Sequence, residues 1–319
     1  MDAAERALFA DTVRQLTVQH SGDELDAALG ELGWTEALTV DRHIAVSVLF
    51  EALGTANGTS SALDQVMCAV LTPSSHGAVA LPPIRTCDAP ARVEGSQVTV
   101  HGLGTRATGR NDAVVLVATD HSRSTSFVVP TAALKLAPAR GLDPDLGLAE
   151  ISGSLERRAL GEGAIVDWDA AVAAGQLALG HELIGAARSM LELARVHALE
   201  RMQFGRPIAS FQAVRHRLAE SLVALDAADA LLAAAWETPG PDAAVAAMAK
   251  ALAGRSARTV ARHCQQVLAG IGFTTEHDLH RFVRRTIVLD QLLGAGSVLT
   301  RRLGTEVLAT KSLPASLPL

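Results

Sequence analysis

The second half of this chain carries four long helical patterns, and they constrain its fold more than any other feature. Glycine- and proline-containing turns separate the patterns, and such turns end helices. The patterns cover roughly 167–202, 208–237, 241–268 and 276–310, and the turns are Phe204-Gly205-Arg206-Pro207, Pro239-Gly240-Pro241 and Gly270-Ile271-Gly272. Long helices with short connections pack against each other in antiparallel order. The sequence therefore predicts a four-helix bundle.

The segment before the bundle has a different pattern, rich in β-branched residues and in turns. The stretch 92–100 contains a turn at Glu94-Gly95 between two strand-like runs, and 113–118 and 126–129 are further strand candidates. Glycine and proline punctuate the rest of this segment. We expect a small β domain over 73–165.

The first part of the chain predicts short helices. Apolar residues recur at helical spacing from Ala3 to about Leu71, and Gly22, Gly33, Gly54 and Gly58 interrupt them. Three or four helices fit this length. The predicted fold is mostly α with a small β domain, divided into a helical part (1–72), a β domain (73–165) and a four-helix bundle (166–319).

Composition excludes several classes of function. The 319 residues are 49% hydrophobic with a net charge of −6, so nucleic acid and anionic membranes are not expected as partners. Three widely spaced cysteines indicate neither a disulfide framework nor a metal site. The N-terminus does not resemble a signal peptide, and no apolar run reaches 18 residues. A cytoplasmic location is the resulting expectation.

The first turn of the predicted bundle carries residues suited to binding a nucleotide cofactor. Arg201 stands at the end of a helical pattern, where its guanidinium could donate two hydrogen bonds to a diphosphate. Phe204 follows three residues later and could lie against a ring system. The alternative is an ordinary helix end, at which Arg201 complements the helix dipole and Gly205 and Pro207 stop the helix.

The last turn of the bundle offers a second set of candidate cofactor contacts. It reads Gln266-Val-Leu-Ala-Gly-Ile-Gly-Phe-Thr-Thr-Glu276. Gly270 and Gly272 would let backbone N–H groups approach a ligand, because glycine has no Cβ and tolerates positive φ. Gln266 precedes Gly270 by one helical turn and would share its face.

Together the two segments resemble the flavin-binding segments in the C-terminal half of the acyl-CoA dehydrogenase family. The resemblance implies the same three-part fold, with FAD as the cofactor. In that family these segments reach across a subunit interface to a neighbouring subunit's FAD, a role that falls here to Arg201, Phe204, Gln212, Gln266 and Gly270. Ala269 replaces a glycine of the pattern, which we take as a mild departure.

The family's own-site residues are missing from this chain. Its C-terminal catalytic glutamate is replaced within Gln291-Leu292-Leu293-Gly294, and the alternative position of that base falls at Gly175-Gln176. The flavin cradle is degraded over Leu71–Gly77, the flavin-facing strand is replaced at Gly104–Ala107, and a further contact is lost at Ala295–Ser297. These departures imply half of an active site.

No other side chain is an obvious substitute for the missing base. The nearby carboxylates are expected to be solvated or to cap helices, and the helical histidines to lie at the surface or to pack. The carboxylates are Asp167, Asp169, Glu182 and Asp290, and the histidines are His181, His197, His216 and His263. We therefore predict no catalytic residue and no metal site.

The resemblance is strongest to the short, degenerate (β) subunit of heterotetrameric acyl-CoA dehydrogenases of bacterial steroid catabolism. It implies a full-length acyl-CoA dehydrogenase-like subunit, an acyl-CoA substrate and an electron-transfer acceptor as partners, with this chain alone inactive. Two alternatives stay open: a self-sufficient acyl-CoA dehydrogenase with an unrecognised base, and a flavin-free helical scaffold. The sequence does not identify the acyl group, the partner or the acceptor.

Overall fold

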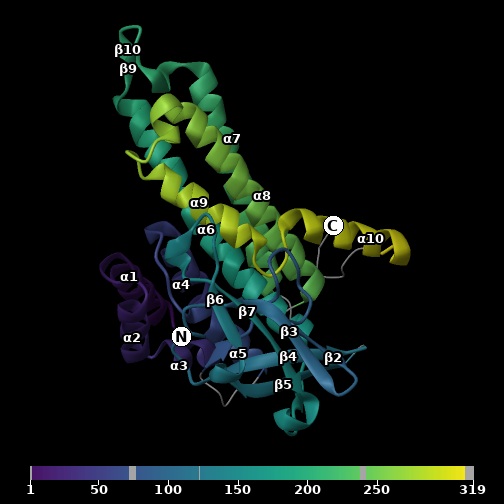
Figure 1. Cartoon of the computed structure of the whole chain (residues 1–319). Helices are drawn as coiled ribbons and strands as arrows, with labels where there is room; N and C mark the ends of the chain where they lie inside the picture. Colours follow the sequence, from purple (N-terminus) through teal and green to yellow (C-terminus); the bar gives the residue numbers. More distant parts are fainter. Residues whose placement is uncertain (1, 72–76, 122, 238–241, 313–319) are drawn as a thin grey trace.

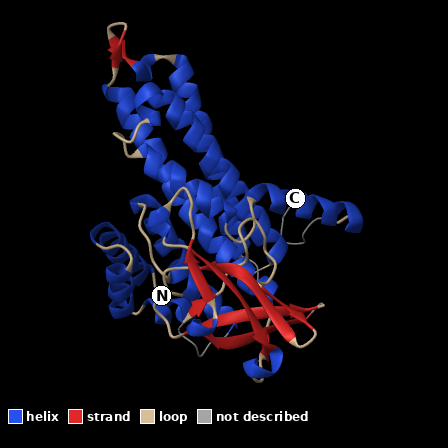
Figure 2. Cartoon of the chain, viewed as in Figure 1, coloured by secondary structure: helices blue, strands red, loops and turns tan. Residues whose placement is uncertain are grey.

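The computed structural model of the chain describes residues 2–71, 77–121, 123–237 and 242–312. Short helices, a β domain and a long helical bundle follow one another along the chain, in the predicted order (Figure 1, Figure 2). The mostly helical fold with a small β domain is thereby confirmed. Among the described residues, no helix combines the length and the apolarity needed to cross a bilayer.

The N-terminal part contains five helices, rather than three or four. They are α1 (Ala3–Gln19), α2 (Asp23–Leu32), α3 (Trp34–Val40), α4 (Arg42–Ala56) and α5 (Ala62–Leu71). Gly33, at φ 79°, ends α2 and begins α3, as its backbone freedom permits. Gly54 does not interrupt a helix as expected but lies inside α4.

Gly54 is explained by the close approach of α4 to the first bundle helix, α6 (Trp168–Glu200). A Cβ at Gly54 would lie 2.0 Å from the carbonyl oxygen of Glu182, and one at Gly185 would lie 2.2 Å from that of Glu51. Both glycines let the two backbones touch. The contact fixes the N-terminal helices against the bundle.

The β domain is built around one eight-stranded sheet. Its strands run in the order β6-β7-β3-β2-β4-β5-β8, and β1 also pairs with β4. They are β1 (Ala78–Val79), β2 (Ala91–Glu94), β3 (Gln97–Gly104), β4 (Ala113–Asp120), β5 (Arg123–Pro130), β6 (Lys135–Pro138), β7 (Ala149–Glu156) and β8 (Ala164–Ile165). The predicted β2–β3 hairpin turns at Gly95, whose φ is 63°. Val98, Leu116, Phe127 and Ile151 anchor its core.

Helix α6 is the central element of the molecule. Every residue from Ala171 to Ala187 is buried, because α6 packs against α4 and α5 as well as the bundle helix α8. Small alanine and glycine side chains let neighbours approach on all sides. The other bundle helices are α7 (Gln212–Trp236), α8 (Ala243–Leu268) and α9 (Leu279–Gln291).

The prediction of a single fourth helix over 276–310 is wrong, because the chain forms two helices there. After α9 the chain turns through Leu293 (φ 51°) and Gly294 (φ 97°) and then forms α10 (Gly296–Thr310), which points away from the bundle (Figure 1). The buried Lys250 stabilises the break, since its Nζ donates to the carbonyls of Asp290 and Gly294. Those carbonyls would otherwise be unpaired at the end of α9.

Candidate cofactor-binding site

The first candidate segment is a tight connection between α6 and α7. Arg201 caps α6, and a two-residue hairpin of β9 (Met202–Gln203) and β10 (Arg206–Pro207) follows. Phe204 (φ 52°) and Gly205 (φ 74°) form its tip. The carbonyl of Arg201 accepts from the N–H of Ile208 at 2.8 Å, which closes the loop. The hairpin projects from the end of the bundle (Figure 1).

Side chains of this connection face solvent. Arg201 and Gln212 are exposed, and Phe204 is 89% exposed. Phe204 has one aromatic neighbour, Phe211, whose ring lies edge-on with centroids 6.1 Å apart. A phenylalanine left this exposed marks a surface that a ligand or partner can cover.

The second segment lies at the C-terminal end of α8. Gln266 is exposed on the last turn of α8, and the chain then forms a 3₁₀ turn over 269–273. A Cβ at Gly270 would meet no atom within 4 Å, so its backbone is open to a ligand. Phe273, just beyond, is 72% exposed.

The glycine argument needs one correction. Neither Gly270 nor Gly272 has a positive φ; Ala269 does, with φ 53° and ψ −132°. Gly272 is required for packing instead, because a Cβ there would lie 2.9 Å from the Cβ of Leu268. The alanine in place of a glycine is therefore a strained departure rather than a mild one.

The structure brings both segments to the same end of the bundle. Helix α6 ends there, α7 begins there and α8 ends there (Figure 1). The electrostatics agree, since burial followed by the charges of His277 and Arg201 lowers the pKa of His197. The five expected cofactor residues, Arg201, Phe204, Gln212, Gln266 and Gly270, are thus all exposed at this end of the bundle.

This surface fits part of a flavin dinucleotide. The N-cap residue of α7, Phe211, provides no side-chain cap, so the first turn of this long helix presents its N–H groups and positive dipole end. Arg201, immediately before the hairpin that joins α6 to α7, adds a cation. A diphosphate suits both, and the exposed Phe204 suits a ring system.

The turn at Leu293, where we expect the family's catalytic glutamate to be replaced, is filled by protein. Leu293 is 1% exposed, and a Cβ at Gly175 would lie 2.4 Å from its Cδ1. The two alternative positions for the base are therefore in contact, and neither carries a carboxylate. Gln176 is buried as well and donates to the carbonyl of Leu293 at 2.8 Å.

The linker between β1 and β2 covers the turn at Leu293 and Gly294 between α9 and α10. The N–H of Arg85 donates to the carbonyl of Gln291 at 2.8 Å, and the Cys87 thiol lies 3.4 Å from the carbonyl of Leu293. The indole of Trp168 donates to the carbonyl of Cys87 at 2.8 Å and holds the linker. The linker is therefore packed directly against the turn at position 293.

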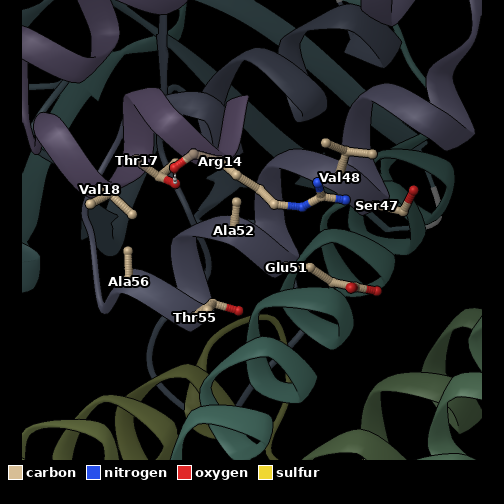
Figure 3. Close-up of a pocket in the computed structure, with 9 residues that line it drawn as sticks. All are labelled: Arg14, Thr17, Val18, Ser47, Val48, Glu51, Ala52, Thr55 and Ala56. Atoms are coloured by element: carbon tan, nitrogen blue, oxygen red, sulfur yellow. Dashed lines mark hydrogen bonds between the residues drawn. The ribbon is translucent and has the colours of Figure 1, made fainter. Parts of the chain in front are cut away.

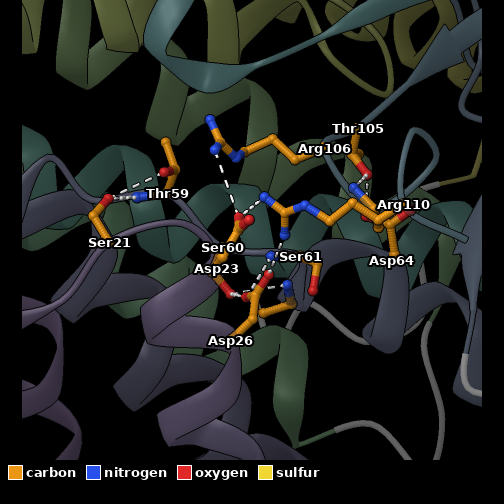
Figure 4. Close-up of polar contacts among 12 residues, drawn as sticks. Ser21, Asp23, Asp26, Thr59, Ser60, Ser61, Asp64, Thr105, Arg106 and Arg110 are labelled. Atoms are coloured by element: carbon orange, nitrogen blue, oxygen red, sulfur yellow. Dashed lines mark hydrogen bonds and ion pairs between the residues drawn. The ribbon is translucent and has the colours of Figure 1, made fainter.

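The loop after β3, where we expect the family's flavin-facing strand to be replaced, is also held by side-chain contacts. Thr105 donates to the buried carboxylate of Asp64 at 2.6 Å, and Arg106 and Arg110 form ion pairs with Asp23 of α2 (Figure 4). Arg110 reaches Asp26 as well. Of the degraded cradle, Thr72–His76 lie outside the described residues. The described residues that we expect to border the chain's own site are therefore held by contacts within the chain.

Two of the four candidate carboxylates are buried, which corrects the expectation that they are solvated. Asp167 caps α6 by accepting from the N–H of Ala170, as predicted. Glu182 is 6% exposed, and burial raises its pKa to about 7 despite the guanidinium of Arg285 at 3.7 Å. Asp290 is buried and pairs with Arg258.

Asp64 was missed by the sequence analysis. It is fully buried, and burial raises its pKa to about 7 even though it accepts from Thr105 and from the N–H of Val79. Nothing in the sequence around Asp64 distinguishes it from an exposed helix residue. Among the residues that the structure describes, no group of three His, Cys, Asp or Glu side chains could hold a metal ion.

Two cavities lined by Glu182 and Glu51 do not supply an alternative active site. Glu182 lines one of about 40 Å³, which has room for a few water molecules. A larger hollow of about 390 Å³ lies between α1 and α4 and includes Arg14, Val18 and Glu51 (Figure 3). Glu51 is already bound there by Arg188 of α6 at 2.8 Å. We assign no chemistry to this hollow.

Comparisons with known proteins agree on one family. Residues 167–308 match the model of the acyl-CoA dehydrogenase C-terminal domain. Acyl-CoA dehydrogenase IpdE2 of Mycobacterium tuberculosis is 31% identical over 321 aligned residues, which cover 95% of this chain and 97% of that protein. The structure of the ChsE4–ChsE5 complex from Mycobacterium tuberculosis matches with a TM-score of 0.77 at 20% identity, over 99% of each chain. A variant of the Tcur3481–Tcur3483 steroid ACAD matches with a TM-score of 0.72 at 20% identity, over 97% of this chain and 99% of that one.

Proposed function

The chain belongs to the acyl-CoA dehydrogenase family, and we propose that it is a subunit that completes the FAD site of a catalytic partner subunit without supplying a base. The observation that carries this proposal is the contrast between its two ends. The end of the bundle with Arg201 and Gly270 is exposed to solvent. In contrast, the side chain of Leu293 is buried, and its carbonyl already accepts hydrogen bonds from within the chain.

The chemistry of the family explains why such a chain needs a partner. Desaturation of an acyl-CoA requires a carboxylate to remove the α-proton and hydrogen bonds to the thioester carbonyl. A bound FAD supplies the acceptor for the β-hydride. Leu293 cannot remove a proton, and Gly175 carries no side chain. The partner would supply the base and most of the flavin contacts.

In this proposal the residues of the open end bind and orient the partner's cofactor. Arg201 and the first turn of α7 would hold the diphosphate, and Phe204 would lie against the cofactor's rings. Gln212, Gln266 and the backbone of Gly270 would supply further contacts. Their exposure in the isolated chain supports this assignment, because a site completed by a second subunit is open until that subunit binds.

A self-sufficient enzyme would need a base with room for substrate beside it. Glu182 and Asp64 are the buried acids with raised pKa values. Asp64 is bonded to Thr105 and Val79, and the cavity beside Glu182 is about 40 Å³. Neither place accommodates a flavin and an acyl group, so this alternative is disfavoured. The FAD content of the complex distinguishes the flavin-free scaffold from our proposal.

Two structural relatives support a heteromeric complex, since these structures pair ChsE4 with ChsE5 and Tcur3481 with Tcur3483. The second is described as a steroid ACAD. We accordingly propose a steroid-derived acyl-CoA as the substrate of the complex. The specificity constant kcat/KM should be higher for a steroid-derived CoA thioester than for a straight-chain one of similar size; equal constants would remove the steroid assignment alone.

The direct test is co-expression with a full-length acyl-CoA dehydrogenase-like subunit from the same host. The isolated chain should be colourless, and the complex should be yellow with one FAD per pair of unlike subunits. Stoichiometric FAD in the isolated chain would contradict the proposal. A stable complex without flavin would favour the scaffold.

A further inference from the structure

Helix α8 carries a row of arginines that the proposed cofactor site does not use. Arg255, Arg258 and Arg262 recur at helical spacing, and all three are exposed. Gln266 continues the row by one more turn, at the proposed cofactor site. We call the three arginines the α8 arginine row. By the rise of an α-helix, the row and Gln266 span about 16 Å.

The row has few counter-charges within the chain. The sequence of α8 from Ala243 to Leu268 contains no aspartate or glutamate. Arg258 pairs with Asp290, but Arg255 and Arg262 form no ion pair among the described residues. Neighbouring α9 adds two more exposed arginines, Arg284 and Arg281, of which Arg281 pairs with Asp278. The exposed arginines of α8 and α9 thus make a basic surface on a chain whose net charge is −6.

We infer that the α8 arginine row docks on an acidic surface of the catalytic partner subunit. The inference rests on the proposed function and names the chemistry of that partner. The row is continuous with Gln266, so a subunit whose FAD reaches Gln266 would extend along it. Arginine pairs with carboxylates through two hydrogen bonds and is less strongly hydrated than lysine, which suits an interface.

The spacing of the row favours a protein surface over a small anion. Arg255 and Arg262 lie about 10 Å apart along the helix axis, too far to converge on one phosphate. Carboxylates repeated along a helix or strand of the partner match that spacing. A polyanionic small molecule would require the arginines to point at one place.

The row also disfavours pairing of the chain with itself. In a two-fold symmetric dimer with the row near the symmetry axis, the arginines of one copy would face those of the other. Like charges opposed across an interface repel. An acidic partner surface removes the repulsion, so the row would select the unlike subunit.

The test compares two double charge reversals in the full-length chain. R255E/R262E changes the row, and R301E/R302E makes the same change in charge at two exposed arginines of α10. The probe is the partner subunit recovered from the co-expressed complex. Each variant of this chain is immobilised, and the Kd for binding of the partner subunit to it is measured. Thermal unfolding of each variant alone reports on the fold, and R255Q/R262Q replaces R255E/R262E if the latter unfolds.

The wild-type Kd should rise about tenfold or more from about 50 to about 300 mM NaCl, because salt screens exposed charges. At low salt R255E/R262E should bind about tenfold more weakly or worse and lose most of its salt dependence, whereas R301E/R302E should stay within about twofold of wild type. If the neutral pair is used, at least about a threefold loss is expected. An R255E/R262E affinity equal to that of R301E/R302E would overturn the inference.

The outcome separates this inference from the proposed function. Suppose that a yellow complex with one FAD per unlike pair forms, and that its Kd changes neither with salt nor with R255E/R262E. The proposed function would then stand, and the α8 arginine row would have no role in docking. Failure of the wild-type chain to form any complex would remove both. R255E/R262E complexes assembled at high protein concentration should hold normal FAD, because the row positions the partner and not the cofactor.

Discussion

Arg201 is the single residue on which the proposed cofactor contact depends most. It is exposed at the end of α6, and no ion pair of its side chain occurs among the described residues. Arg201→Glu places an anion where a diphosphate is proposed, and loss of a charge-assisted hydrogen bond alone costs about 1.5–3 kcal/mol. The Kd of the complex for FAD should rise at least about tenfold, and its FAD occupancy, measured by absorbance, should fall accordingly. Thermal stability of the isolated chain should not change.

Arg140→Glu is the matched control for Arg201→Glu. It makes the same change in charge at an exposed position of the β domain, away from the bundle end. Its complex should keep normal flavin content. Equal flavin in both variants would return Arg201 to the role of an ordinary helix-end residue.

Leu293 tests whether the missing glutamate is the only defect. Its side chain is buried against Gly175, so Leu293→Glu removes apolar packing and buries an unpaired charge. The unfolding free energy should fall by about 3 kcal/mol or more. Acyl-CoA-dependent reduction of an artificial acceptor by the isolated variant, with FAD supplied, should be undetectable. Clear turnover would mean that this chain holds a complete flavin site of its own.

At the level of elements, the sequence predicts helices well wherever periodicity is long and turns carry glycine or proline. The end of α6, the start of α7 and the end of α8 fall close to their predicted positions for this reason. The break between α9 and α10 was missed, because Leu292 and Leu293 continue an apolar helical pattern. Tertiary contacts of Lys250 with the carbonyls of Asp290 and Gly294 decide that break, and local propensity does not contain them.

In the turn after α8, two adjacent residues are expected to affect different properties: Ala269 the stability and Gly270 the cofactor binding. Ala269 occupies backbone angles that glycine adopts without strain, so Ala269→Gly should raise the unfolding free energy by up to about 1 kcal/mol. Gly270→Ala adds a methyl group in open space and should leave stability unchanged. The same methyl would obstruct the proposed cofactor approach and lower FAD occupancy of the complex. If flavin content survives Gly270→Ala, Gly270 does not contact the cofactor.

At the level of the whole molecule, the sequence predicts that residues of the chain's own site are missing, but it could not predict the contacts that pack this region. The contact of Cys87 with Leu293 joins residues 206 positions apart, and no local pattern encodes it. The ion pairs that hold Arg106 and Arg110 against α2 likewise depend on the tertiary fold. The open end was predictable because its residues lie in two short segments.

One buried cluster joins all three parts of the molecule. Arg285 of α9 pairs with Asp143 of the β domain, donates to the carbonyl of Gly58 in the N-terminal part, and lies 3.7 Å from Glu182 of α6. Burial raises the pKa of Glu182 to about 7. Asp64, buried between α5 and the β domain, has its pKa raised to about 7 by the same cause.

These raised pKa values predict that the whole molecule loses stability as the pH rises. A carboxyl group with a higher pKa in the folded state binds more protons there than in the unfolded state, so its contribution is complete below pH about 4 and is lost as the pH rises through about 7. Glu182→Gln keeps the shape but cannot ionise. It should match wild type at pH about 5 and exceed it by up to about 3 kcal/mol at pH about 8 in urea unfolding. Lys250, whose pKa burial lowers to about 8, changes stability in the opposite direction only at higher pH. A variant with the same difference from wild type at both pH values would show that Glu182 is ionised in the folded protein and that Arg285 holds it as a buried ion pair.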